Sequence, residues 1–327
     1  MQIAVVYNAE NTKDDYADFI YTLLEDEAVK NEYTLQQWGQ ATPKQNTLVV
    51  IPCKYSSQLA TAFWYRVTLP SILQKINASV VINLDAVIHP SIKISQIAFA
   101  ESAGFLTDKK QCTNASQLYA NKCFRHHDDR QCSFIFPSTA QANELKDINR
   151  DISAEIIHYT SLSPVKEREW HEKLMIRARE SSNTEYFLSV IDDDMEAFMT
   201  LMKAFSKFKK WQQSSMQLIL ISSNDFLMDD IREKLSSYKY RNDVQLLTEA
   251  ADDRSDELIS AAYSFIYLQK QPVPMPGLVH IMLNGTPLIC QANDEIKEYC
   301  GDSVIYTAAN DSDSLGDTML MIYKDEN

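Results

Sequence analysis

The sequence contains only six glycines in 327 residues, whereas soluble proteins use about 7% glycine on average. Backbones that cradle a diphosphate need glycine, because glycine lets the chain approach a ligand closely and adopts positive φ without strain. A nucleotide-binding enzyme of this length normally uses more glycine. The composition therefore argues against glycine-rich phosphate loops.

Long apolar runs are also absent, since none approaches the roughly 18 residues that a membrane-spanning helix needs. The opening MQIAVVYN has no basic region and no cleavage site, so we expect a first strand rather than a signal peptide. With 45% hydrophobic and 23% charged residues, the composition is that of a globular protein, and we expect a cytoplasmic one.

Basic residues are outnumbered, because 31 Lys and Arg face 45 Asp and Glu and give a net charge of −14. Nucleic-acid binding depends on clustered Lys and Arg, so this balance argues against nucleic acid as a partner. It also disfavours adsorption to an anionic membrane, although a local basic patch could override the average.

Six cysteines in a chain of this length do not make a disulfide framework. Cys112, Cys123 and Cys132 lie near the HHDD stretch at 126–129, but their spacings are not the close pairs that structural zinc sites use. We expect free thiols, no metal site, and a solvated loop at HHDD.

What the sequence does contain is an alternation of short apolar runs and longer amphipathic stretches. A first set of runs predicts strands at 3–8, 47–53, 79–88, 95–100 and 133–137, with helices notably at 14–29 and 57–76. After a polar stretch, a second set predicts strands at 186–191, 216–222, 244–247, 264–268, 286–290 and 303–307. The helices that separate them are expected at about 195–213, 225–238, 254–262 and 311–324.

Apolar strands that lack in-and-out alternation and are joined by helices indicate parallel sheets covered on both faces. Two successive sets predict an α/β protein of two Rossmann-like, doubly wound domains. We place the N-terminal domain at 1–155 and the C-terminal domain at 156–327, with a hinge within 150–165.

The second half of the chain carries a series of motifs in a fixed order. They are LMKAFSKFKKW (201–211), YKYRNDVQLL (238–247), ELISAAYSFIYL (257–268), NGTPLIC (284–290), GDSVIYT (301–307) and DSLGDTMLMIYKDEN (313–327). In this order they resemble the family-4 (group 1) retaining glycosyltransferases, which have the GT-B fold. The resemblance covers about 184–327 by motif and 1–150 only by the pattern of elements. It implies two domains facing each other across a cleft, the N-terminal one on the acceptor side and the C-terminal one on the side of a nucleotide-sugar donor.

The resemblance also implies which positions would bind the donor, and the residues there have changed. In the family, two glutamates separated by seven residues border the donor sugar and the nucleotide ribose. Aligning NGTPLI on the family's CGTPVI places Pro272 and His280 at these positions, followed by Gly285 and Thr286. Proline has no side-chain acceptor and neutral histidine offers one lone pair, so neither replaces a carboxylate.

The residues at the position that binds the donor diphosphate also differ from those of the family. The family uses glycine with an arginine and a lysine after the first strand of the C-terminal domain, whereas this chain has Asp192, Asp193 and Asp194. At about 4 Å and an effective dielectric near 20, each like-charge contact costs roughly 4 kcal/mol. We favour helix capping by these aspartates over the alternative, a Mg²⁺ site.

On the N-terminal side, Glu101 stands at about the position of the family's sugar-contacting histidine. It is the candidate catalytic residue of the chain, as a base, although a partly exposed structural carboxylate is the simpler interpretation. The loop that corresponds to the family's glycine-rich acceptor loop, at 8–19, has no glycine and contains Asp14, Asp15 and Asp18.

Two local predictions concern the C-terminal domain. We expect a short helix at 276–284, closed by Gly285, that leads into the strand at 286–290. We also expect the last helix to approach or return to the N-terminal domain, as the resemblance implies. Its apolar stripe consists of Leu315, Met319, Ile322 and Tyr323.

These changes favour a pseudo-glycosyltransferase of bacterial polysaccharide synthesis, because function depends on the site and not on the fold. Such a protein would need no cofactor and would act as a binding or scaffold partner of another glycosyltransferase or of a glycan. The alternative is an active, nucleotide-sugar-dependent transferase with an unusual donor site, whose missing cations come from other loops. A third interpretation is a structural subunit without a ligand.

Overall fold

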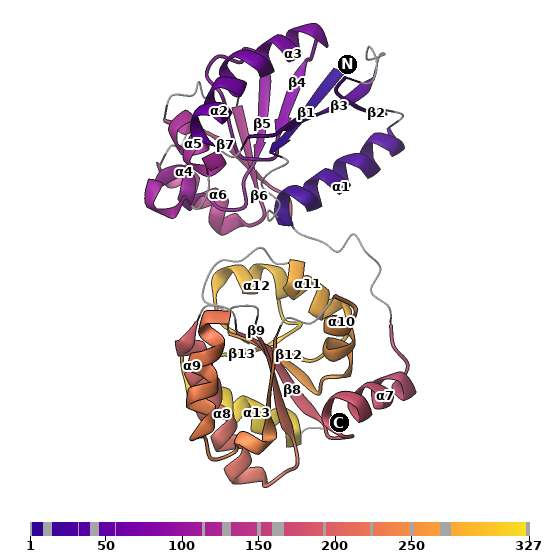
Figure 1. Ribbon diagram of the computed structural model, residues 1–327, viewed down its shortest axis with the longest axis vertical. Coiled ribbons are helices and arrows are strands. Elements are labelled where there is room, and N and C mark those ends of the chain that lie inside the picture. The colour runs from indigo at the N-terminus through magenta and orange to yellow at the C-terminus, as the bar shows by residue number, and fades with distance from the viewer. Residues whose placement is uncertain are drawn as a thin grey trace. The chain divides into compact units, whose positions relative to one another are not determined.

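The computed structural model describes residues 2–8, 15–31, 33–39, 46–55, 57–112, 115–125, 132–148, 152–158, 167–191, 194–222, 225–248, 252–268 and 276–324. The chain divides into two compact units, Met1–Leu162 and Ser163–Asn327 (Figure 1). The sequence had placed the boundary seven residues earlier, at 155/156. Each unit has its own parallel sheet, which confirms the predicted α/β architecture of two Rossmann-like domains.

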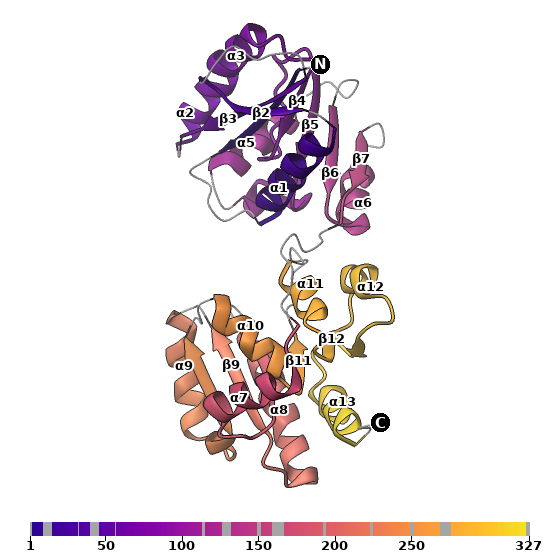
Figure 2. The same ribbon diagram turned by 90° about the vertical axis from the view of Figure 1, so that its right-hand side faces the viewer.

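The first unit is built on a seven-stranded sheet whose strands lie in the order β2-β3-β1-β4-β5-β6-β7. The strands are β1 (Gln2–Asn8), β2 (Thr34–Gln37), β3 (Thr47–Cys53), β4 (Val80–Asn83), β5 (Ser95–Phe99), β6 (Cys132–Phe136) and β7 (Ser153–Ile156). The helices are α1 (Asp15–Lys30), α2 (Gln58–Phe63), α3 (Leu69–Lys75), α4 (Gly104–Thr107), α5 (Ala115–Phe124) and α6 (Thr139–Ile148), with short turns η1 (Trp64–Thr68) and η2 (Lys109–Gln111). Helices lie against both faces of this sheet (Figures 1 and 2).

Burial explains which strands of this sheet the sequence could predict. The central strand β1 carries Ala4, Val5 and Val6 with no exposed surface, and nearly all of β3 is buried. The two edge strands, β2 and β7, are mostly exposed and carry polar residues, so they show no apolar run. They were the strands that the sequence did not predict.

A continuous helical stretch over 58–75 confirms the helix predicted at 57–76. The side chain of Ser57 caps its start by accepting a hydrogen bond from the Ala60 N–H at 3.4 Å. Its middle, η1, is a π-helical turn, a widened turn that often occurs at functional sites. Trp64, Tyr65 and Leu69 of this stretch are buried in the core of the first unit.

The second unit is built on a six-stranded sheet in the order β10-β9-β8-β11-β12-β13. The strands are β8 (Tyr186–Val190), β9 (Gln217–Ser222), β10 (Val244–Thr248), β11 (Ser264–Tyr267), β12 (Leu288–Gln291) and β13 (Ile305–Thr307). The helices are α7 (Trp170–Ser181), α8 (Met195–Gln212), α9 (Asp225–Ser236), α10 (Asp252–Ala261), α11 (Pro276–Leu283), α12 (Asp294–Cys300) and α13 (Ser312–Lys324), with a short turn η4 (Arg241–Asp243). Numbered within the unit, the strand order is 3-2-1-4-5-6, the order of dinucleotide-binding folds.

Helix α7 lies in the polar stretch for which the sequence predicted no helix. It begins with a capping box in which Glu172 Oε2 accepts the Glu169 N–H at 2.9 Å. Of its large apolar residues, Trp170, Leu174 and Met175 are exposed and Ile176 is buried, so the sequence of the helix shows no continuous apolar stripe.

The last helix, α13, belongs to the second unit and packs along α8. Leu315 and Met319 are buried in the core there, and Ile322 and Tyr323 pack against the same core. The apolar stripe that we expected to dock on the N-terminal domain is therefore covered within its own unit.

Candidate functional site

In doubly wound sheets, ligands bind outside the carboxyl ends of the strands, at the point where the strand order reverses. In the second unit this point lies between β8 and β11, and in the first unit it lies between β1 and β4. Asp192 and Asp193 follow β8, and Pro272 follows β11, but all three lie outside the described residues. The described candidates of the second unit are Asp194, His280, Gly285 and Thr286.

Asp194 caps the N-terminus of α8, as the sequence predicted. Its carboxylate Oδ1 accepts the Glu196 N–H at 2.8 Å and the Ala197 N–H at 3.0 Å. A helix N-terminus attracts anions because its first amides lack partners within the helix and its dipole end is positive. Here the Asp194 carboxylate already accepts hydrogen bonds from two of those amides. Glu196 adds a second negative charge in the first turn of the helix.

His280 lies on α11 and joins that helix to α10. Its Nε2 lies 2.5 Å from Oδ1 of Asp256, and both side chains are about one third exposed. The backbone carbonyl of His280 accepts a hydrogen bond from Asn284 Nδ2 at 3.0 Å. The imidazole of His280 is thus engaged by a carboxylate of the neighbouring helix.

Gly285 and Thr286 form the end of α11. The helix ends at Leu283, Gly285 has a φ of +69°, and its N–H donates to the Met282 carbonyl at 3.0 Å. The hydroxyl of Thr286 is buried and donates to the Ile259 carbonyl of α10 at 2.7 Å. This geometry confirms the short helix closed by Gly285, although the strand that follows begins at Leu288 rather than at residue 286.

A groove of about 490 Å³ lies beside the start of α8, within the size range of small-molecule sites. The lining residues are Met195 of α8, Asp230, Glu233 and Lys234 of α9, and Ser237, which follows α9. Two carboxylates against one ammonium group give these walls a net negative charge. The groove therefore suits a neutral or cationic group better than a diphosphate.

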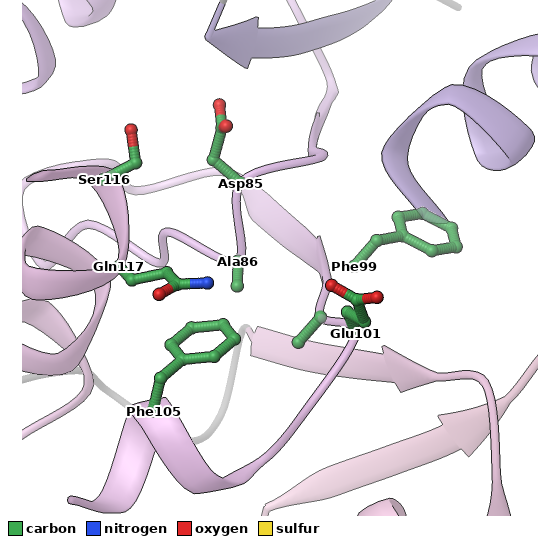
Figure 3. A pocket seen from close by; sticks show the side chains of 8 residues that line it. Asp85, Ala86, Phe99, Glu101, Phe105, Ser116 and Gln117 are labelled. Atoms are coloured by element: carbon green, nitrogen blue, oxygen red, sulfur yellow. The ribbon is translucent and has the colours of Figure 1, made fainter. Parts of the chain in front are cut away.

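In the first unit, Glu101 follows β5 and lines a small cavity together with residues that follow β4 and residues from α4 and α5 (Figure 3). The lining residues are Asp85, Ala86, Phe99, Ala100, Glu101, Phe105, Ser116 and Gln117. The cavity volume is about 10 Å³, which is room for about one water molecule. It is too small for a sugar, so Glu101 is placed at a strand end as predicted but faces no substrate-sized space there.

A buried polar cluster, which sequence reasoning missed, lies next to this cavity. Asn83, the last residue of β4, donates from Nδ2 to the Tyr65 hydroxyl at 2.8 Å and accepts the Asp85 N–H at Oδ1 at 2.8 Å. The ring of His89 stacks against those of Tyr65 and Tyr119. One signal was available, because Asn83 and Asp85 interrupt an otherwise apolar run over 80–88.

Burial governs the protonation of this cluster. It raises the pKa of Tyr65 well above its ordinary value, and the nearby Asp85 carboxylate adds to the effect. Burial also lowers the pKa of His89 from 6.5 to about 4, with a smaller contribution from Arg66. His89 Nδ1 accepts the Ser91 N–H at 3.2 Å, so the imidazole is neutral at neutral pH and serves as a hydrogen-bond acceptor.

The part of the chain that the structure describes holds no group of three or more His, Cys, Asp or Glu able to bind a metal ion. All six cysteines are free thiols. The HHDD stretch lies outside the described ranges, as does Asp14 of the acceptor-side loop, while Asp15 and Asp18 fall in α1. None of the described helices is long and apolar enough to cross a membrane.

Comparison with solved structures shows that the chain has the fold of the GT-B glycosyltransferases. HepE from Anabaena, solved in complex with UDP and glucose, superposes with a TM-score of 0.65 at 12% identity, over 99% of this chain and 90% of that chain. A glycosyltransferase from Rickettsia africae gives a TM-score of 0.71 at 11% identity, over 99% of this chain and 88% of the other. WaaG, a glycosyltransferase involved in lipopolysaccharide biosynthesis, gives 0.65 at 13% identity, over 98% and 90%.

Sequence comparisons find no such likeness, since no protein-family model and no curated protein matches the chain. At 11 to 13% identity the structural likeness extends to the fold alone. The chain thus has a GT-B, glycosyltransferase-like fold, made of two Rossmann-like domains.

Proposed function

We propose that this chain is a pseudo-glycosyltransferase that acts in bacterial glycan or polysaccharide synthesis as a binding or scaffold partner. Its partner is another glycosyltransferase or a glycan, and it acts in the cytoplasm without a cofactor. The structural similarity supports a role in glycan synthesis, because HepE was solved with UDP and glucose, and WaaG is involved in lipopolysaccharide biosynthesis.

The observation that carries the proposal is the carboxylate of Asp194 on the first amides of α8. A phosphate that binds at a helix N-terminus uses such amides. Here it would have to displace the carboxylate that accepts the Glu196 and Ala197 N–H groups, and it would meet the negative charge of Glu196 itself. The acidic walls of the neighbouring groove add to this repulsion.

The second end of a donor lacks its partner in the same way. The ribose hydroxyls of a nucleotide sugar need a carboxylate acceptor, and His280 at that position is held by Asp256. The diphosphate and the ribose of the donor therefore lose their contacts at two separate places, and the two losses of binding free energy add.

The alternative is an active transferase with an unusual donor. It is supported by the extent of the structural similarity, since the match to HepE covers 99% of this chain and 90% of that chain, over both units. That alternative requires cationic side chains from other loops to replace the family's arginine and lysine.

The test is titration calorimetry with UDP-glucose, UDP-N-acetylglucosamine and GDP-mannose. We compare the wild-type protein with His280→Glu and with a triple variant in which Gly-Arg-Lys replaces Asp192 to Asp194. His280→Glu alone should not restore binding, because the phosphates still meet the aspartates. Asp194→Ser is the matched control, because serine keeps a capping oxygen and removes the charge. Micromolar binding of any donor by the wild-type protein would reject the proposal in favour of the alternative.

A further inference from the structure

Two cysteines of the second unit lie against each other near one edge of its sheet. Cys290 belongs to β12 and has no exposed surface, and Cys300 is the last residue of α12 and is also buried. Their side chains are hydrogen-bonded to each other. The structure therefore brings two reduced thiols into contact inside a folded domain.

The backbone around the two cysteines supports this contact independently. Residues in register in a parallel sheet point to the same face, and Cys290 is in register with Tyr306 of β13. The Tyr306 hydroxyl donates to the carbonyl of Gly301 at 2.7 Å. Because Gly301 directly follows Cys300, the end of α12 lies over the face from which the Cys290 side chain projects.

A third sulfur atom lies beside the two thiols. The Cys300 thiol donates to Sδ of Met282 on α11 at 3.5 Å. A structural zinc site takes four ligands from Cys, His and carboxylates. Over the described ranges, no group of three or more such residues is placed to bind a metal ion. The contact therefore favours thiol chemistry over structural zinc.

Cysteines of the first unit have partners of another kind. The Cys112 thiol donates to the Phe105 carbonyl at 3.5 Å. The sulfur of Cys132 accepts a hydrogen bond from Gln96 Nε2 at 3.9 Å. These sulfurs contact an oxygen and a nitrogen group, whereas the pair in the second unit joins sulfur to sulfur.

The two thiols of the pair differ in acidity. The hydrogen bond with Cys300 raises the pKa of Cys290, and burial raises it further. The same hydrogen bond lowers the pKa of Cys300, because the Cys290 thiol donates to the Cys300 thiolate. The thiolate is the nucleophilic form of cysteine, so Cys300 is the thiol that reacts first.

We propose that Cys290 and Cys300 are a site of oxidative modification, at which hydrogen peroxide produces a reversible disulfide. The Cys300 thiolate attacks one peroxide oxygen, the O–O bond breaks, and the leaving hydroxide takes a proton from solvent and departs as water. Cys300 is then a sulfenic acid. The Cys290 sulfur attacks the sulfenic sulfur, its proton passes to the leaving hydroxyl group, and a second water departs as the S–S bond forms. Two thiols are oxidised to one disulfide, and one peroxide is reduced to two waters.

The oxidant needs a route to Cys300, because buried cysteines are usually inert. Cys300 is followed by Gly301, Asp302 and Ser303, which are exposed between α12 and β13. Local opening of an exposed turn requires less free energy than global unfolding. This turn is the route by which a molecule as small as hydrogen peroxide reaches the sulfur.

The disulfide ties the end of α12 to β12 and closes a ring over residues 290–300. The ring contains the turn after the carboxyl end of β12, and ligands of doubly wound sheets bind at the carboxyl ends of the strands. Oxidation therefore stiffens one segment of this edge, whether or not a sugar donor binds there. Disulfides of this reversible kind serve as redox sensors in reducing compartments.

The experiment is peroxide treatment of the whole chain, followed by alkylation of the free thiols and digestion with trypsin. Trypsin cleaves after Lys270, Lys297 and Lys324, so the two cysteines fall in different peptides, 271–297 and 298–324. We expect mass spectrometry to find these two peptides joined, and dithiothreitol to separate them. The number of free thiols should fall by two from the six of the reduced protein. The melting temperature should rise by about 5 °C, because the cross-link restricts the unfolded chain.

The variants Cys290→Ala and Cys300→Ala should each abolish the joined peptide and the rise in melting temperature. The matched control is Cys112→Ser, which removes a thiol of the first unit and should leave both results unchanged. Circular dichroism checks that each variant is folded, and the peptide map of the wild-type protein needs no variant. Treated wild-type protein whose two peptides stay separate would overturn the proposal, even if peroxide adds oxygen to Met282 or Cys300. A disulfide between either peptide and a cysteine of the first unit would overturn it as well.

Discussion

The two units place different chemistry at the same point of their sheets. In the first unit, the strand next to the switch point ends in Asn83, which enters a buried cluster with Tyr65, His89 and Tyr119. In the second unit, the helix that follows β8 begins at Met195, and the carboxylate of the preceding Asp194 caps it. One sheet has a buried hydrogen-bonded cluster at its carboxyl end, with the Asp85 carboxylate beside it, and the other has a carboxylate that caps a helix.

The difference shows that strand order fixes where a ligand could bind but not whether one can. In a doubly wound parallel sheet, a ligand binds in the crevice at the switch point of the strand order. The side chains placed there decide the rest. In the first unit they leave a cavity of about 10 Å³, and in the second they occupy the amides that a phosphate would use.

The largest expected effect comes from removing the centre of the buried cluster. Asn83→Ala leaves the Tyr65 hydroxyl and the N–H groups of Asp85 and Val87 without this partner. We expect the free energy of unfolding of the first unit to fall by about 4 kcal/mol, because each buried polar group left unpaired costs about 1–3 kcal/mol.

The matched control for this variant is Ser189→Ala in the second unit, where one buried hydroxyl donates to the Ile266 carbonyl at 2.8 Å. It should cost about 1 kcal/mol. Urea unfolding followed by circular dichroism measures both. Equal losses for Asn83→Ala and Ser189→Ala would contradict the role given to the cluster.

Acid should weaken the first unit through His89. Its pKa is lowered from 6.5 to about 4 in the folded protein, so between these values the unfolded chain binds more protons than the folded one. The contribution of neutral His89 to the free energy of unfolding is complete above pH 6.5. It is lost as the pH falls toward 4, and the total loss is about 3 kcal/mol.

The comparison for this prediction is His89→Phe, which keeps a ring between Tyr65 and Tyr119 but does not titrate. Stability measured at pH 7, 5 and 4 should fall less steeply for the variant than for the wild-type protein. The same pH dependence in both would mean that His89 is not the group responsible.

An intermediate effect is expected at the end of α11. Gly285→Val forces a β-branched residue to a φ of +69°, and we expect a loss of about 2 kcal/mol. Apart from the two chain neighbours of Gly285, no atom of the described residues lies within 4 Å of an added Cβ, so the cost is conformational. Gly277→Ala on the same helix also has open space, lacks the positive φ, and should not destabilise the protein. Thermal melting tests the pair, and a wild-type melting temperature for Gly285→Val would refute the cap.

The smallest effect concerns the cap of α8. Asp194→Ala removes the acceptor of two helix amides and should lower the free energy of unfolding by about 1 kcal/mol. Asp194→Ser keeps a hydroxyl acceptor and should lose only a fraction of that value. If alanine and serine give equal stability, the carboxylate is not the cap.

More of the fold than of the candidate site could be predicted from the sequence. Buried strands such as β1 and β3 form continuous apolar runs, and the order of runs and helices sufficed for two Rossmann-like domains. The edge strand β2 and the helix α7 were missed because their side chains are largely exposed and show no apolar period.

The site depends on contacts between residues far apart in the sequence, which a single sequence does not reveal. Tyr65 and Asn83 are 18 residues apart and His280 and Asp256 are 24 residues apart, yet each pair is hydrogen-bonded. By contrast, the cap formed by Asp194 is local, because the carboxylate contacts residues two and three positions on. It was therefore predictable from the position of three aspartates before an amphipathic helix.

The most direct test of the account is calorimetric titration of the wild-type protein with UDP-glucose. We expect no saturable binding at millimolar concentration, which corresponds to a binding free energy weaker than about −4 kcal/mol. A dissociation constant in the micromolar range would contradict it, because a donor diphosphate would then bind despite the carboxylate on the first amides of α8.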